Sequence, residues 1–271
     1  MKAYERFLEY VAVWTTSDEN SDTVPSAARE LDLAKKLVEE MKGLGIEDAR
    51  VDDKGYVYGS VPATPGCEDK AALGLIAHMD TAMDASGKDI KPQLIKNYDG
   101  GDVVLGTSGN VLSVAEFPHL AGLKGRTLIT TDGTTLLGAD DKAGIAEILT
   151  AVDEIIKEGL PHSKICIGFT PDEEIGRGSD HFDVEGFGAD YAYTLDGDAE
   201  GEIQYENFNA STGFVTCHGV SVHTGSAKDI MVNSQTIATE FHQMLPADER
   251  PETTEGYEGF YHLNAMSGNV T

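Results

Sequence analysis

The chain has 271 residues, 40% of them hydrophobic, and its 47 acidic against 20 basic side chains give a net charge of -27. This length is enough for a hydrophobic core in one or two domains, and so much negative charge argues against proteins that bind nucleic acid or anionic membranes. Small or cationic partners, such as metal ions, fit the charge better. The three cysteines are odd in number and widely spaced, which argues against a disulfide framework or a zinc ribbon. With no apolar run long enough to span a bilayer, we expect a cytoplasmic protein with reduced thiols.

The first part of the chain predicts two helices and a hairpin. Tyr4–Trp14 has the pattern of a short amphipathic helix. Apolar residues then recur at helical spacing over Leu31–Leu44, with Ser26 as the expected N-cap. The Asp-Asp-Lys-Gly turn before Tyr56–Val61 is typical of a hairpin.

Three short apolar runs are expected to be strands buried on both faces. The runs are residues 71–77, 165–169 and 189–195. Each leads into a polar segment, which is His78–Thr81 for the first, Thr170–Glu174 for the second and Asp196–Asp198 for the third. A glycine-rich excursion, Ala82–Thr135, follows the first strand and is expected to form loops and hairpins that extend the edge of the sheet.

A further acidic pair, Asp140–Asp141, follows an apolar lead-in and a Gly-Ala turn, and a helical pattern begins there. One face of this helix is apolar. The residues of that face are Ile145, Ile148, Leu149, Val152, Ile155 and Ile156. We expect a strand-to-helix junction, where helix amides steady a carboxylate and where ligands collect in an open α/β sheet. An isolated Asp-Asp pair would be interpreted as a helix cap.

Together, these acidic segments predict a metal site, because packing carboxylates at converging strand ends is costly without a cation. Alone, His78 would be a core histidine, Glu173–Glu174 a solvated loop and Asp196 part of a turn. Carboxylates with one imidazole suit zinc, cobalt or manganese in a hydrolytic site. Asp140 is the expected bridge between two ions, and Asp80 would orient the His78 ring. On an extended chain Glu173 and Glu174 would point opposite ways and divide the roles of general base and ligand.

In order and content, these motifs resemble those of the co-catalytic zinc peptidase clan. The matching segments are 78–81, 138–144, 171–176 and 195–197. Other segments resemble the peptidase T family of that clan, whose members are tripeptide aminopeptidases. These segments are Gly87–Asp102, Gly176–Phe182, Tyr205–Ala210 and Glu255–Tyr261. The resemblance covers essentially the whole chain.

The resemblance implies a phosphorylase/hydrolase-like α/β catalytic domain, with helices on both sides of a mixed sheet, and a partial α+β lid domain. The domains would be residues 1–207 and 208–271. It further implies one zinc bound by His78, Asp140 and Asp196, and a second bound by Asp140 and Glu174. Glu173 becomes the general base and acid in the hydrolysis of the peptide bond.

In the lid, His223 matches the histidine that the family uses to hold the oxyanion, although Thr224 stands where proline usually follows. Family members continue beyond the position of Thr271, and the resemblance implies that the missing part supplies a second histidine to the Glu174 zinc. We therefore expect one strong and one weak zinc site, together with exposed apolar surface that favours association, for example as a homodimer.

The predicted function is metal-dependent release of the N-terminal residue from short peptides, and the tripeptide preference follows from the family likeness alone. Two alternatives stay open. The chain could be a metal-binding remnant without catalysis, or a magnesium-dependent phosphotransferase with Asp196 as its nucleophile. The latter leaves His78 and Glu173–Glu174 unexplained and has Glu200 where such enzymes carry a hydroxyl residue.

Overall fold

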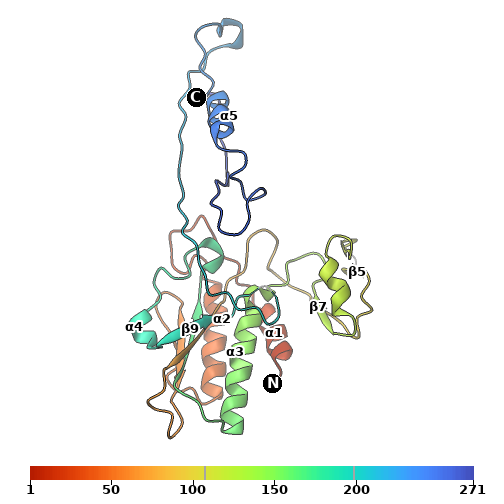
Figure 1. Ribbon diagram of the computed structural model, residues 1–271, viewed down its shortest axis with the longest axis vertical. Helices are drawn as coiled ribbons and strands as arrows, with labels where there is room; N and C mark the ends of the chain where they lie inside the picture. Colours follow the sequence, from red (N-terminus) through yellow and green to blue (C-terminus); the bar gives the residue numbers. More distant parts are fainter. Residues whose placement is uncertain (107, 198) are drawn as a thin grey trace. The chain divides into compact units, whose positions relative to one another are not determined.

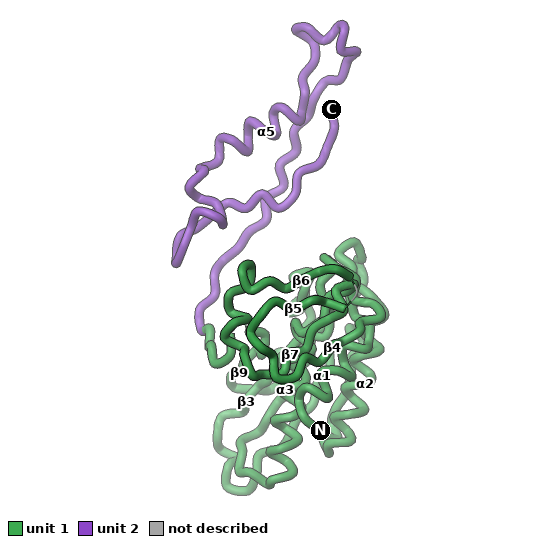
Figure 2. The backbone as a smooth tube through the Cα atoms, turned by 90° about the vertical axis from the view of Figure 1, so that its right-hand side faces the viewer, with its two compact units in different colours: residues 1–204 green, residues 205–271 purple. Residues whose placement is uncertain are grey.

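The computed structural model describes residues 1–106, 108–197 and 199–271, so Asp198 of the Asp-Gly-Asp segment lies outside the described residues. The chain divides into two compact units, Met1–Gln204 and Tyr205–Thr271 (Figure 2). Among the described residues there is no helix with the length and hydropathy of a membrane span.

The first unit contains a mixed five-stranded sheet (Figure 1). Its strands lie in the order β1-β2-β8-β3-β9. The strands are β1 (Arg50–Val51), β2 (Val57–Val61), β3 (Leu73–His78), β8 (Ile165–Thr170) and β9 (Tyr191–Thr194). The first two pair antiparallel as the predicted hairpin, while β8, β3 and β9 run parallel. The carboxyl ends of these three parallel strands therefore lie at one edge, as the sequence predicted.

Three helices cover one face of this sheet: α1 (Ala3–Val11), α2 (Glu30–Gly43) and α3 (Ala139–Glu158). The residues of β8 alternate between the two faces, so that Ile167 packs in the core under these helices and Cys166 joins the opposite cluster. That opposite cluster contains Phe187 of the short helix α4 (Val184–Phe187). The predicted α/β fold with helices on both sides of a mixed sheet is confirmed.

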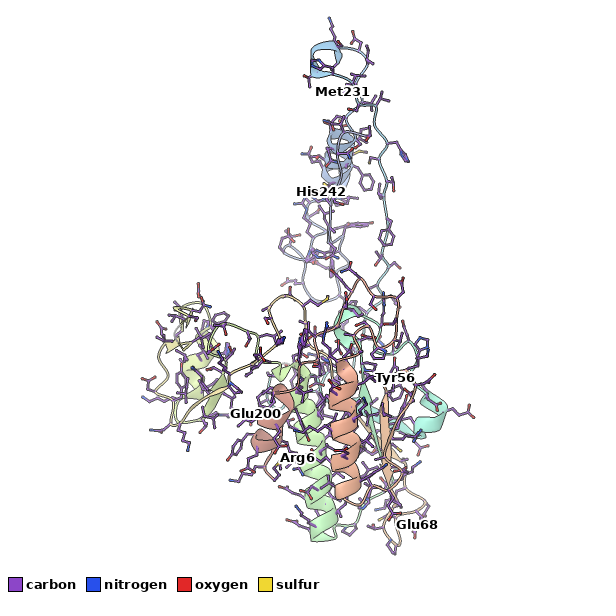
Figure 3. The ribbon with its side chains drawn as sticks, turned by 180° about the vertical axis from the view of Figure 1, so that it is seen from behind. Arg6, Tyr56, Glu68, Glu200, Met231 and His242 are labelled. Atoms are coloured by element: carbon purple, nitrogen blue, oxygen red, sulfur yellow. The ribbon has the colours of Figure 1, made fainter. Side chains whose placement is uncertain are left out.

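A buried guanidinium fixes the three helices to one another. Arg6 of α1 is 2% exposed and lies among the helices (Figure 3). Its Nε donates to Glu40 Oε1 of α2 at 2.7 Å, and its NH2 donates to Asp153 Oδ2 of α3 at 2.9 Å. A buried charge is tolerated only when it is paired in this way, so the network fixes how the helices pack.

Two predictions about the glycine-rich excursion and the last strand are wrong. The excursion does not extend the main sheet; it forms two separate antiparallel pairs, β4 (Gln93–Ile95) with β7 (Leu128–Thr130) and β5 (Val103–Val104) with β6 (Val111–Leu112). These pairs bury their apolar side chains in a small core of their own around Tyr98 and Leu105, so they do not have to pair with the main sheet to be covered. The last strand, β9, is exposed throughout rather than buried, because it pairs with β3 alone.

The predicted cap of the second helix and the strand predicted to lead into the third also differ from the structure. Helix α2 begins at Glu30 after Arg29, and the Ser26 hydroxyl, which was expected to cap it, accepts a hydrogen bond from the Asp18 amide. Helix α3 follows a loop after β7, so no strand of the main sheet leads directly into it. On its apolar face Ile145, Ile148, Leu149 and Val152 are buried, as predicted, whereas Ile156 is 37% exposed.

The second unit contains α5 (Ser234–Met244), capped by the Asn233 side chain, and the short 3-10 helix η3 (Thr224–Ser226). An isolated antiparallel bridge joins Val220 and Val232.

A buried acid ties the start of α2 to the end of β8. Glu30 is 1% exposed, and its carboxyl accepts hydrogen bonds from the amides of Ala27 and Asp172. Burial, together with the charges of Asp172 and Asp80, raises the pKa of Glu30 to about 8. The protonated form of Glu30 is therefore favoured by folding.

We expect this group to make the fold less stable at alkaline pH. Because its folded-state pKa lies above the unfolded value of about 4.3, its stabilising contribution is complete below that value and is lost as the pH rises through about 8. Urea unfolding of Glu30→Gln between about pH 5 and 9 should give a smaller fall in the free energy of unfolding than the unmodified chain shows. The matched control is Glu39→Gln, an exposed glutamate of the same helix. An unchanged pH slope in Glu30→Gln would contradict the assignment.

Candidate metal centre

Five predicted site residues meet at the carboxyl edge of the three parallel strands. His78 is the last residue of β3, and Asp196 follows β9. Glu173 and Glu174 open the short 3-10 helix η2 (Glu173–Ile175) after β8, and Asp140 stands at the start of α3. Segments far apart in sequence are thus brought to one place by the parallel register, which pairs His78 with Thr170.

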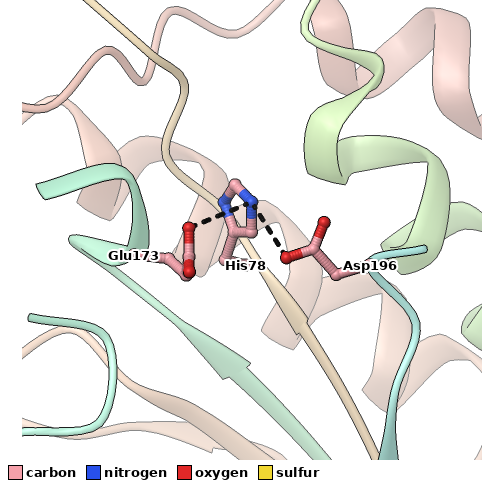
Figure 4. A group of neighbouring side chains, drawn as sticks. All are labelled: His78, Glu173 and Asp196. Atoms are coloured by element: carbon pink, nitrogen blue, oxygen red, sulfur yellow. Dashed lines mark ion pairs between the residues drawn. The ribbon is translucent and has the colours of Figure 1, made fainter. Parts of the chain in front are cut away.

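The imidazole of His78 lies at the centre of the group. Its Nε2 is 2.8 Å from Asp140 Oδ1, 3.7 Å from Glu173 Oε2 and 3.8 Å from Asp196 Oδ2. Figure 4 shows Glu173 and Asp196 approaching the ring from either side. The ligand atoms form two sets, each within 4.8 Å: one of His78, Glu173 and Asp196, and the other of His78, Asp140 and Glu174.

Asp80 holds this group from behind. It is fully buried, and its Oδ1 accepts from the Glu173 amide at 2.9 Å and faces His78 Nδ1 at 3.3 Å. Its Oδ2 accepts from the Glu174 amide at 3.0 Å and from the Ser17 hydroxyl at 2.7 Å. The main-chain oxygen of Asp80 lies still closer to His78 Nδ1, at 3.1 Å. Acceptors on the Nδ1 side leave Nε2 directed at the other acids, which fits the orienting role predicted for Asp80.

The adjacent aspartates of α3 have different contacts. Asp141 is buried, and its Oδ1 accepts from the Gly144 amide while its Oδ2 accepts from the His78 amide, both at 3.1 Å. The side chain of Asp140 is 70% exposed and is directed at the His78 ring. The peptide bond between them is cis, and both residues depart from helical geometry. Asp141 is therefore the helix cap, and Asp140 is free for the site.

Two local features bring the remaining acids inward. Glu173 and Glu174 were predicted to lie on extended chain, but they lie on a 3-10 turn. The turn follows Asp172, whose φ of 57° is in the left-handed region. Gly144 allows the chain before Asp196 to pass close to α3, because a Cβ there would collide with the Leu195 carbonyl oxygen.

The charges at this site are not balanced by the chain itself. Burial alone would lower the pKa of His78, but hydrogen bonds with the carboxylates of Asp140 and Asp80 outweigh it and raise the pKa to about 11. Burial raises the pKa of Glu174 to about 7, with the charge of Asp140 adding to it. Burial likewise raises the pKa values of Glu173 and Asp196. Glu173, Glu174 and Asp196 thus resist ionisation next to one another, whereas the contacts with His78 lower the pKa values of Asp140 and Asp80. Carboxylates and an imidazole gathered in this way become the donor set of a cation site once they give up their protons.

The structure brings together His78, Asp80, Asp140, Glu173, Glu174 and Asp196. It sorts them differently from the predicted ligand sets, since Glu173 is grouped with His78 and Asp196, and His78 rather than Asp140 is common to both sets. His223 lies in the second unit, where its Nδ1 accepts a hydrogen bond from the Gly225 amide, and its contribution stays a prediction.

Sequence reasoning missed several buried polar residues around the site. Ser17, Glu30, Asp172 and Lys142 are all at most 2% exposed. Lys142 Nζ donates to the Val13 carbonyl at 2.8 Å, and burial lowers its pKa to about 7. Lys142 and Asp172 lie within the segments that carry the metal motifs, so their place in the sequence could have indicated that they lie near the site. Nothing in the sequence distinguishes Ser17 in this way.

Comparisons with known proteins give consistent results. Residues 205–271 match the M20_dimer family, described as a peptidase dimerisation domain. The chain is 57% identical over 268 residues to peptidase T of Clostridium acetobutylicum, covering 98% of this chain and 65% of that protein. It is 55% identical over 268 residues to peptidase T of Aliivibrio fischeri, again covering 98% of this chain and 65% of that protein. The chain thus spans about 65% of the length of these relatives.

Solved structures with a similar fold include an aminopeptidase PepT from Bacillus cereus, with a TM-score of 0.57 and 25% identity, covering 90% of this chain and 56% of that one. A tripeptidase from Staphylococcus aureus has a TM-score of 0.60 at 21% identity, and the match covers 94% of this chain and 58% of that one. The second likeness concerns the fold alone.

The neighbouring aspartates of α3 should respond differently to substitution. Asp141→Ala removes the helix cap and leaves the buried His78 amide without its acceptor, so the free energy of unfolding should fall by about 1–3 kcal/mol. Asp140→Ala removes a carboxylate that is 70% exposed, and the His78 ring that it contacts keeps Asp80 and can release its proton, so the free energy of unfolding should fall by less than in Asp141→Ala. Urea unfolding in the presence of a chelator measures both. Equal losses would show that the two side chains do not divide these roles.

Proposed function

Because the chain belongs to the peptidase T family, we propose that it carries the metal centre of an aminopeptidase that hydrolyses the first peptide bond of short peptides. The observation that supports this most directly is the convergence of one imidazole and four carboxylates, from four separate segments, in two overlapping sets whose ligand atoms lie within 4.8 Å of one another. The tripeptide preference rests on the family likeness.

The metal would be held by His78, Asp140, Glu174 and Asp196, and this donor set suits zinc, cobalt or manganese. Zinc is our proposal for the native ion, with Asp140 as the carboxylate shared by two ions. When bound, such an ion polarises a carbonyl and makes a nearby water more acidic. All the other steps fall to side chains of this chain.

Glu173 is the proposed general base and acid. Its side chain is half exposed, so it can reach a water molecule and a substrate, and its pKa is raised by burial, which suits a group that both accepts and returns a proton. It would take a proton from the attacking water and deliver it to the leaving amine. Asp80 holds the Glu173 amide and the His78 ring, so the base and the imidazole stay fixed relative to each other.

Residues 208–271, which make up most of the second unit, are the proposed partial lid, and residues 1–207 are the proposed catalytic domain. The match of the second unit to a peptidase dimerisation domain supports a homodimer. Within it, His223 is exposed and its ring is held by Gly225, which fits a histidine that stabilises an oxyanion when the lid closes. The three free thiols fit a cytoplasmic protein.

Metal content tests the centre itself. The two ligand sets share His78, and its Nε2 can bind only one ion, so the other ion is left with carboxylates alone. We therefore expect about one zinc per chain after dialysis against trace zinc, measured by elemental analysis, and a second only at higher zinc concentration. His78→Gln should lose the tight zinc. Absence of bound zinc, or a His78→Gln variant that binds as the unmodified chain does, would contradict the centre.

Catalysis is tested through the base. Glu173→Gln should reduce release of the N-terminal residue from a tripeptide by at least about a hundredfold while zinc content is unchanged, because the amide cannot accept the proton. The matched control is Glu185→Gln, an exposed glutamate of α4. Equal activity in Glu173→Gln and the unmodified chain would exclude this residue as the base. If the unmodified chain binds zinc but cleaves no peptide, the chain is a metal-binding remnant.

A further inference from the structure

A segment near the N-terminus lies directly behind the metal centre. Residues Val13–Ser17, which follow α1, run beside Thr81, three residues beyond the end of β3, and Thr16 forms a parallel bridge with Thr81. The Thr81 amide donates to the Thr15 carbonyl and the Ser17 amide donates to the Thr81 carbonyl, each at 3.3 Å. We call Val13–Ser17 the N-terminal strap.

The backbone of this strap is fixed without help from the Ser17 hydroxyl. Lys142 Nζ donates to the Val13 carbonyl at 2.8 Å, and Arg29 donates to the carbonyls of Thr16 and Ser17. These contacts come from helix α3 and from the segment before α2. Loss of the Ser17 hydroxyl therefore leaves the position of the strap defined.

The Ser17 hydroxyl is directed at Asp80. It is 2.7 Å from Asp80 Oδ2, while its distance to the Thr81 carbonyl oxygen is 3.3 Å, so its one hydrogen is donated to the carboxylate. Ser17 is 2% exposed and Asp80 fully buried, so water cannot replace the hydroxyl. Of the four donors around Asp80, two are amides of η2, one is the His78 ring and the fourth is Ser17.

We propose that Ser17 is a positioning residue of the metal centre, acting through Asp80 on the His78 ring and on the segment Glu173–Glu174. The effect that we expect on metal binding rests on the proposed function. The hydroxyl is one of three hydrogen-bond donors that set the orientation of the Asp80 carboxylate, together with the amides of Glu173 and Glu174. This orientation keeps Oδ1 at 3.3 Å from His78 Nδ1, beside the Asp80 main-chain oxygen at 3.1 Å from the same nitrogen, and so keeps Nε2 available as the ligand atom. Without the hydroxyl, each carboxylate oxygen retains one amide of η2, and Oδ2 loses its shortest hydrogen bond.

The test combines two readouts on the 271-residue chain. In the metal-free protein with ¹⁵N-labelled histidine, the His78 Nδ1 proton, which faces the main-chain oxygen and Oδ1 of Asp80, should give a hydrogen-bonded NMR signal, identified by its loss in His78→Gln. Ser17→Ala should shift or broaden this signal, and Ser17→Thr should preserve it. Zinc affinity, measured by competition with a chelator, should fall about tenfold in Ser17→Ala and stay within about twofold in Ser17→Thr.

The matched control is Ser60→Ala. Ser60 also donates its hydroxyl to a carboxylate, Asp48 Oδ2 at 2.6 Å, but it pairs with Cys166 near the opposite end of β8. It should leave both readouts unchanged. The inference is overturned if Ser17→Ala keeps the His78 signal and the zinc affinity, or if Ser17→Thr loses as much as Ser17→Ala. The NMR arm decides it even if the unmodified chain binds no zinc, an outcome that would count against the proposed function alone.

Discussion

The buried carboxylate of Asp80 is the interaction on which the rest of the site depends. An ionised carboxylate without exposure to water is tolerated only if its oxygens are fully hydrogen-bonded. Asp80 meets this condition with donors from three segments: the strap before α2, the end of β3 and the turn after β8. These segments are fixed to one another because each supplies a donor that the carboxylate needs.

From this buried acid outward, exposure increases and the task of the acids changes. Asp80 and Asp141 are buried, bind backbone amides and hold the chain in place. Asp196, Glu173 and Asp140 have side chains 30%, 50% and 70% exposed, and they face the outer nitrogen of His78. The imidazole joins the two layers, since its Nδ1 belongs to the inner one and its Nε2 to the outer one. An ordered inner layer with an open outer layer suits a site that binds an ion and then admits a substrate.

The order of apolar runs and acidic ends was sufficient to predict the parallel strands, the convergence of four segments and the residues that meet. Two kinds of feature could not be predicted. The first is local backbone geometry: adjacent acids were expected to alternate as on a strand, but Asp172 enters a left-handed turn and Glu173–Glu174 lie on a 3-10 helix. The second is partnership across long separations, as between Ser17 and Asp80 or Glu30 and Asp172, because neither spacing nor periodicity specifies such contacts. The exposed β9 was missed for a related reason, since an apolar run does not say how many neighbours a strand has.

The register of β3 against β8 is the constraint that connects fold to chemistry. His78 pairs with Thr170, and the next residue, Met79, donates its amide to the Thr170 carbonyl at 2.8 Å. A slip of one residue would turn His78 to the opposite face, and a slip of two would move it by about 6.6 Å, beyond reach of Asp140. The register is specified by core residues such as Ile167 and Phe169 of β8, which must face the helices, rather than by the polar residues at the strand ends. Positioning of the proposed metal ligands therefore depends on hydrophobic packing along the whole length of the two strands, while Asp80 orients the groups at the strand ends.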